Sequence, residues 1–210
     1  MKFLYLYVFL VCSLQSYSQL DYSHQCLTSE SLIRNSDSCE VTLHEELVNS
    51  IFPFWYGTPW DFNGYTDVPN EGVVACGYFV STTLKHVGFN LNRYDIAKMY
   101  SSDIVKTLCF NDYWVEEDFE KFLFRMQTMD DGLYIVGLSS HVGFIEQVRG
   151  RTYFIHANYI GTNGVEKELA SSSDALSGSA TFWLGNFTNN AELIDAFKEK
   201  RVIKKLDNIE

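Results

Sequence analysis

The sequence predicts an α+β protein, with helices first and an antiparallel sheet afterwards. Two observations support this. Between residues 41 and 129, apolar residues recur at helical spacing. Between residues 133 and 160, apolar runs of strand length alternate with turn signals, and Arg149-Gly150 is typical of a β-hairpin. A chain of 210 residues without internal repeats predicts one domain with a full core.

Helices are expected in the first part of the domain. They cover residues 41–52, 76–86 and 115–129, with two short helical pieces between residues 91 and 108. The second ends before Gly88, and the third carries acids in its first turn and Arg125 near its end, as the helix dipole favours. Residues 54–72 are rich in Gly, Pro and aromatic residues, which predicts an aromatic loop.

The second part of the chain is expected to form the sheet. The predicted strands cover residues 133–138, 141–148, 151–160 and 180–187. Between them, the Ser-rich stretch 166–179 indicates a loop with one helical turn, and residues 190–206 predict a closing helix. We expect the whole of 41–210 to form a single domain.

Residues 1–18 are typical of a secretory signal peptide. An apolar core of about ten residues follows a positive start, which is too short to span a bilayer, and no later segment is expected to cross a membrane. The sequence therefore predicts export to the periplasm or beyond. Lipidation at Cys12 is disfavoured because Phe9-Leu10-Val11 lack the small residue expected there. Residues 19–40 are polar and weakly patterned, and predict a loose N-terminal lead-in.

The net charge of -11 argues against nucleic acid and anionic membranes as partners. Beyond the signal peptide lie four cysteines: Cys26, Cys39, Cys76 and Cys109. Export permits disulfides, and Cys26 could pair with Cys39. Four cysteines can pair fully in three ways, and all three stay open. The chain has no CxxC or HExxH motif, so we expect neither a metal nor another cofactor.

Cys76 and His141 are the residues most indicative of chemistry. Cys76 opens a predicted helix, whose positive end and a nearby imidazole would lower the pKa of its thiol. Gly77 beside it leaves the backbone amide approachable, as an oxyanion site requires. A lone cysteine is more often a small buried hydrophobe. His141 favours catalysis, because it opens a strand in which Gly143 gives room for close approach.

His156 is the favoured third member of the group. It interrupts an apolar strand, so it needs a polar partner, which a neighbouring strand carrying His141 would supply. Asn158 lies two residues further on the same face and is the rival for this orienting role. The three residues Cys76, His141 and His156 could also bind zinc, but the usual motif pairs are missing.

The chain from residue 55 to 159, about half of the sequence, resembles the NlpC/P60 cell-wall peptidases. The matching motifs are Gly57-Thr58-Pro59-Trp60, Cys76, His141-Val142-Gly143 and Ile155-His156-Ala157. The resemblance implies a papain-like fold, with Cys76 as nucleophile, His141 as base and His156 orienting it. It also implies that the substrate is a peptidoglycan stem peptide and that the substrate contacts are Trp60, Asp61, Ala75, Gly77 and Ser140.

The sequence departs from the family pattern beside the nucleophile. It has Ala75-Cys76-Gly77 where Asp-Cys-Ser is usual, Trp60 where tyrosine is usual, and Asn63 in place of a glycine. Two alternatives therefore stay open. One is an amidase or acyltransferase of the same fold acting on another amide or ester, and the other is a non-catalytic binding module that uses the aromatic loop. An inhibitor protein that caps the site also stays open as a partner.

Overall fold

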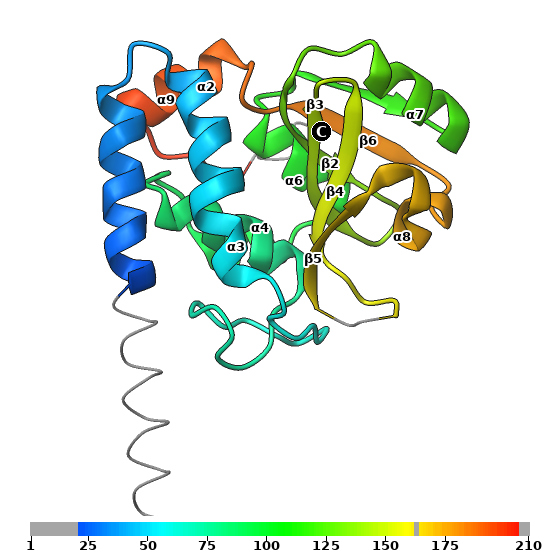
Figure 1. The fold of residues 1–210 in the computed structure, drawn as a ribbon, viewed down its shortest axis with the longest axis horizontal. Helices are drawn as coiled ribbons and strands as arrows, with labels where there is room; N and C mark the ends of the chain where they lie inside the picture. The colour runs from blue at the N-terminus through cyan, green and yellow to red at the C-terminus, as the bar shows by residue number, and fades with distance from the viewer. Residues whose placement is uncertain (1–20, 162–163, 206–210) are drawn as a thin grey trace, which may run out of the picture.

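The computed structural model describes residues 21–161 and 164–205, and within them the α+β prediction is confirmed (Figure 1). One antiparallel sheet has the strand order β1-β6-β2-β3-β4-β5. Its strands are β1 (Tyr113–Glu116), β2 (Gly132–Gly137), β3 (Val142–Val148), β4 (Arg151–Ala157), β5 (Val165–Leu169) and β6 (Phe182–Asn186). The predicted signal peptide, with Cys12, lies outside the described residues.

Helices cover both faces of this sheet. On one face α4 (Cys76–His86) packs on β3 and β4, and α6 (Ser101–Leu108) packs on β2 and β6. On the other face lie α7 (Phe119–Gln127) and α8 (Asp174–Ser177), as Figure 1 shows. The remaining elements are α2 (Cys39–Glu45), the π-helical η1 (Glu46–Ile51), α3 (Phe52–Trp55), α5 (Arg93–Ala97), the 3-10 helix η2 (Ala170–Ser172) and α9 (Ala191–Lys198). In the described ranges, every helix is too short or too polar to cross a bilayer.

The central strands are apolar on both faces because a hydrophobic core lies on each side of the sheet. Phe52, Phe79 and Phe144 belong to the larger core, under α4. Phe122 of α7 stacks on Phe182 of β6 in the smaller core, with ring centroids 4.7 Å apart. Every residue of β2 is consequently buried, which explains its continuous apolar sequence.

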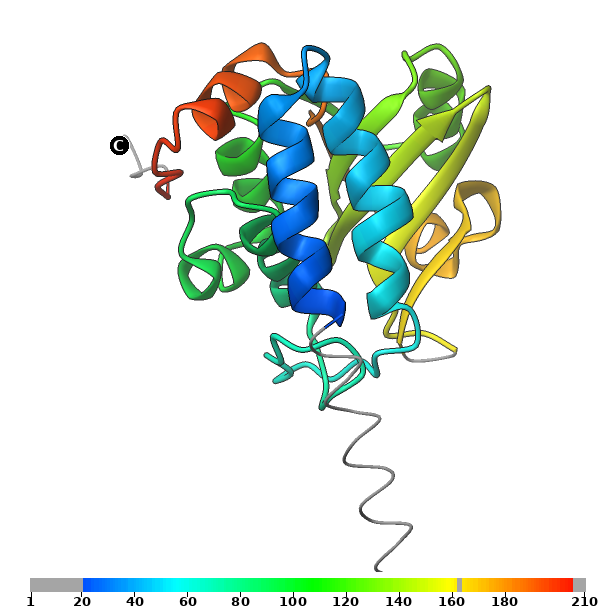
Figure 2. The same ribbon diagram turned by 60° about the vertical axis from the view of Figure 1, so that its left-hand side comes forward.

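The prediction of a loose lead-in over residues 19–40 is wrong for its described part. Residues 21–35 form a helix that lies beside the continuous helical segment α2–η1–α3, antiparallel to it (Figure 2). Tyr22, Cys26, Ser29 and Ile33 are buried at helical spacing, so one face of this helix belongs to the main core. The polar residues between them concealed this narrow stripe in the sequence.

Three predicted boundaries also need correction. The helix expected over 115–129 begins only at Phe119, because the Asp118 side chain caps its first turn and residues 113–116 pair with β6 as strand β1. The loop expected over 166–179 begins instead with strand β5, which pairs with β4. The final helix ends at Lys198 instead of continuing to residue 206.

Two other predictions are confirmed closely. Helix α4 covers the expected residues, Cys76–His86. The β3–β4 hairpin turns at Arg149 and Gly150, whose φ angles of 50° and 72° are those that a two-residue hairpin turn requires. The hairpin matters for the site, because it aligns the two histidine-bearing segments.

Candidate active site

A cavity of about 780 Å³ opens where the first turn of α4 meets the start of β3. Cys76 and His141 both line it, from α4 and from the residue before β3. Aromatic side chains form much of its wall, and Phe62, Tyr65 and Tyr100 are exposed to 79%, 63% and 82% of their surface. The aromatic side chains lining the cavity are Trp60, Phe62, Tyr65, Tyr78, Tyr100 and Tyr159.

Cys76 is the first residue of α4 and is half-buried. Its neighbour Gly77 must be glycine, because a Cβ there would lie 2.5 Å from the carbonyl oxygen of Ala97. Burial raises the pKa of the Cys76 thiol, although the backbone amides of Val142 and Gly77 act in the opposite direction. The expected lowering of this pKa is therefore wrong, because desolvation outweighs the amides at the helix start.

His141 is buried, and its Nε2 lies 2.9 Å from Nδ1 of His156. Burial, together with the charge that His156 can carry, lowers the pKa of His141 well below 6.5. The imidazole of His141 is therefore neutral near pH 7 and can accept a proton. Among the described residues, no hydrogen bond joins Cys76 to His141, but the amide of Val142, adjacent to His141, reaches the cysteine sulfur.

His156 lies on β4 and is completely buried. Gly143 allows the two strands to approach, since a Cβ there would lie 2.8 Å from Cβ of His156. Within the described part of the chain, the side chain of the rival residue Asn158 forms its hydrogen bonds with residues other than His141. Its amide donates to Glu166, and its carbonyl oxygen accepts from the backbone of Ile160 at 2.8 Å. The structure therefore brings His156 and His141 together.

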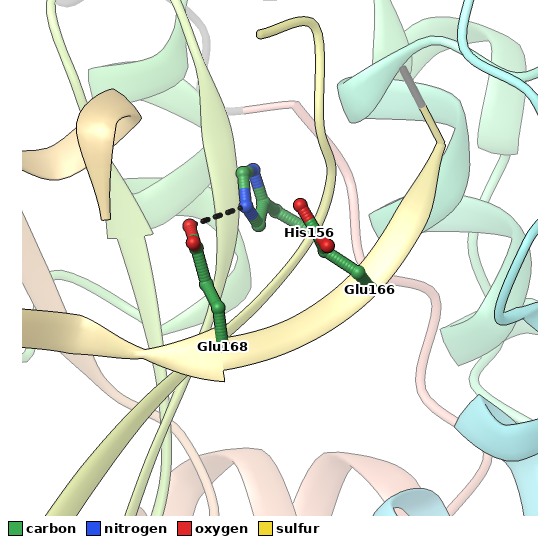
Figure 3. Close-up of side chains that lie close together, drawn as sticks. All are labelled: His156, Glu166 and Glu168. Atoms are coloured by element: carbon green, nitrogen blue, oxygen red, sulfur yellow. Dashed lines mark hydrogen bonds and ion pairs between the residues drawn. The ribbon is translucent and has the colours of Figure 1, made fainter. Parts of the chain in front are cut away.

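Glu168 extends this arrangement and was missed in the sequence. Its Oε1 lies 3.0 Å from Nε2 of His156 (Figure 3). Burial raises the pKa of Glu168, but hydrogen bonds from His156 and Ser173 outweigh it and hold that pKa below its ordinary value. The carboxylate is thus ionised near neutral pH. Glu166 and Glu168 are two residues apart in a strand-length segment, which is the signal that could have placed both on one face.

His156, Glu166 and Glu168 are grouped closely enough to be considered as a cation site, since one potential ligand atom from each lies within 4.8 Å of the others (Figure 3). All three already take part in hydrogen bonds. Glu168 accepts from His156, and Glu166 accepts from the Asn158 amide. Hydrogen bonds thus hold each member of this cluster in place.

The sequence-predicted substrate contacts fall into two groups. Trp60, Ala75, Gly77 and Ser140 line the cavity. Asp61 is not among the residues lining it, and its carboxylate accepts a hydrogen bond from the backbone of Asn63 at 2.8 Å. Asp61 therefore stabilises the turn of the aromatic loop.

The remaining cysteines lie away from the cavity. Cys26, Cys39 and Cys109 are buried and all three thiols are free, so the possible Cys26–Cys39 disulfide does not form in this structure. Burial raises the pKa of Cys26 to about 11. Cys76, which is only half-buried, is thus the described cysteine that a substrate can reach through the cavity.

No protein-family model matches this chain, and neither the curated proteins nor the solved structures contain a match to it.

Proposed function

We propose that this protein is an exported cysteine hydrolase that cleaves an amide bond with Cys76, His141 and His156, on a papain-like domain of the NlpC/P60 type. One observation carries the proposal. A thiol at a helix start shares a cavity with a buried, neutral imidazole whose Nε2 is hydrogen-bonded to a second histidine. This is the pattern of an activated nucleophile, with a base and a group that orients the base.

In the mechanism that follows, the resting thiol and imidazole are both neutral. His141 takes the thiol proton as the sulfur of Cys76 attacks the carbonyl carbon. The backbone amide of Cys76, at the positive end of α4, stabilises the oxyanion. The protonated His141 then gives its proton to the leaving amine, and a thioester remains on Cys76. Water, deprotonated by His141, attacks the thioester, releases a carboxylic acid and restores the thiol.

We propose peptidoglycan stem peptides as the substrate class. The aromatic walls of the cavity suit an extended peptide, and Lys98 is the one permanently charged group among the described residues that line it. The described lining contains no Asp or Glu, so the cavity suits an acyl segment with a carboxylate better than one with a free amine. Periplasmic or extracellular localisation follows from the signal-like N-terminus.

An amidase or acyltransferase on another amide or ester is the second candidate. It is favoured by Ala75 and Gly77, which offer no side-chain hydrogen bond beside the nucleophile. A binding module that uses the exposed aromatic residues would need no buried histidine pair, and we place it third.

The test is digestion of purified peptidoglycan, with the released fragments weighed by mass spectrometry. Wild-type protein is compared with Cys76→Ala and with Cys26→Ala as the control for loss of a cysteine outside the cavity. Fragments from wild type and Cys26→Ala, but not from Cys76→Ala, support the proposal and identify the bond. Thiol-dependent turnover of soluble amides or esters without release from the wall supports the second candidate, and no turnover of either supports the binding module.

A further inference from the structure

We infer that Glu168 is a positioning residue that fixes the tautomers of both histidines and thereby determines which nitrogen of His141 acts as the base. The assignment of a catalytic role rests on the proposed function. The tautomers themselves follow from three hydrogen-bonding groups in series: Glu168, His156 and His141.

The series begins at the carboxylate, which can only accept hydrogen bonds when it is ionised. The pKa of Glu168 lies below its ordinary value, so Nε2 of His156, 3.0 Å away, must carry a hydrogen and donate it. When the ring of His156 carries a single hydrogen, that hydrogen is on Nε2 and Nδ1 is bare. That nitrogen is an acceptor.

The bare Nδ1 of His156 in turn determines the tautomer of His141. Nδ1 of His156 lies 2.9 Å from Nε2 of His141, so Nε2 of His141 must be the donor. Burial keeps His141 neutral, so it has one ring hydrogen, on Nε2, and a bare Nδ1. Nδ1 is then the nitrogen able to take a proton from Cys76.

The opposite arrangement is disfavoured by the same contacts. If His156 carried its hydrogen on Nδ1, a bare Nε2 lone pair would face the carboxylate of Glu168 without a hydrogen between them. His141 would then have to accept at Nε2 and carry its hydrogen on Nδ1, where it could not act as a base toward the thiol. The negative charge of Glu168 thus selects the active pair of tautomers.

Packing against neighbouring rings holds both imidazoles in the positions that these two hydrogen bonds need. The ring of His156 stacks on Phe154, with centroids 3.9 Å apart and planes 17° apart. His141 meets His156 nearly edge-on, at an interplanar angle of 82°. A 180° flip of the His156 ring would keep its stacking but would replace both bonded nitrogens with carbons, so the hydrogen bonds to His141 and Glu168 fix the ring orientation. Within that orientation, Glu168 determines which nitrogen carries the hydrogen.

The test is nitrogen NMR of ¹⁵N-histidine-labelled protein in the Cys76→Ala background, where long-range couplings report which ring nitrogen carries the hydrogen. We expect His141 and His156 both to carry it on Nε2. In Glu168→Gln the amide offers a donor as well as an acceptor, so a fraction of His141 should shift to the Nδ1-protonated tautomer. Glu117→Gln, which removes an exposed carboxylate outside this cluster, is the control and should leave the tautomers unchanged.

Kinetics of the Cys76-containing protein supply a second readout. Glu168→Gln should lower kcat by about 10- to 100-fold, the range expected when a charge-assisted hydrogen bond is lost, with little change in KM because Glu168 does not line the cavity. A folded Glu168→Gln protein with wild-type tautomers and a kcat equal to that of Glu117→Gln would overturn the inference. Because the NMR experiment needs no activity, it decides the tautomers even if Cys76→Ala shows that the proposed function is wrong.

Discussion

Gly143→Ala adds one methyl group at the point where β3 passes the histidine of β4. The new carbon would lie 2.7 Å from Cε2 of Phe154, 2.8 Å from Cβ of His156 and 2.9 Å from the carbonyl oxygen of Ile155. All three contacts are shorter than real Cβ atoms show, and one of them is with the main chain. The neighbouring strand or the ring of Phe154 must therefore shift to make room.

The expected cost of this overpacking is about 1–3 kcal/mol of unfolding free energy. For a domain of this size that corresponds to a fall in Tm of roughly 2–4 °C for each kcal/mol. Activity should fall further than stability, because the displacement lengthens the 2.9 Å bond between His141 and His156. We expect at least about a tenfold loss in kcat at a temperature where the variant remains folded.

Urea denaturation measures the first effect and steady-state kinetics the second. The control is Gly178→Ala, an exposed site with a right-handed backbone at the end of α8, where a Cβ would meet one atom, the carbonyl oxygen of Asp174 at 3.0 Å, and we expect a change below about 1 kcal/mol. A Gly143→Ala protein whose urea midpoint and kcat both match wild type would refute the reasoning about close strand approach.

Three other expectations concern pH and the cavity wall. The acid limb of kcat/KM should lie well below pH 6.5, because burial lowers the pKa of His141, whereas a limb at pH 6.5 or above would contradict a neutral buried base. Burial lowers the pKa of His86 to about 4, so its neutral form stabilises the fold above pH 6.5 and this contribution, about 3 kcal/mol, is lost as the pH falls toward 4. Urea midpoints measured across that range should fall more steeply for wild type than for His86→Gln, and parallel curves would exclude the effect. Tyr100→Ala should leave stability within about 0.5 kcal/mol, because the side chain is 82% exposed, yet raise KM for the substrate; an unchanged KM would remove Tyr100 from the binding surface.

Much of the site could be predicted from the sequence because its signals are local. Cys76 begins a helix with a clear apolar pattern, and the hairpin at Arg149 and Gly150 sets the register that brings His141 beside His156. A histidine in an apolar strand also indicates a buried polar partner, and the structure has one.

What the sequence did not reveal depends on contacts between distant segments. Glu168 reaches His156 only because β5 pairs with β4. The residues that follow β5 are rich in serine, so the sequence predicts a loop where this five-residue strand lies. The pKa of Cys76 depends on how deeply the helix start is covered, which the residues around it do not encode locally.

The N-terminal helix was missed for a related reason. Four buried residues spaced along 21–35 are enough to pack this helix against the core. The residues between them are polar, so the mean hydropathy of the segment suggests a loose structure. Tyr22 illustrates the tertiary origin of this order, because its hydroxyl bonds to both Trp55 and His86. Neither partner is near it in the sequence.

The most direct test of the central claim is to capture the acyl group on the protein during turnover. Wild-type protein is mixed with an activated ester, quenched in acid within milliseconds to seconds, and analysed by intact mass and peptide mapping, with Cys76→Ala and Cys109→Ala in parallel. We expect a transient thioester on the peptide that contains Cys76, in wild type and Cys109→Ala alone. An acyl group on another side chain, or turnover that persists in folded Cys76→Ala, would contradict it.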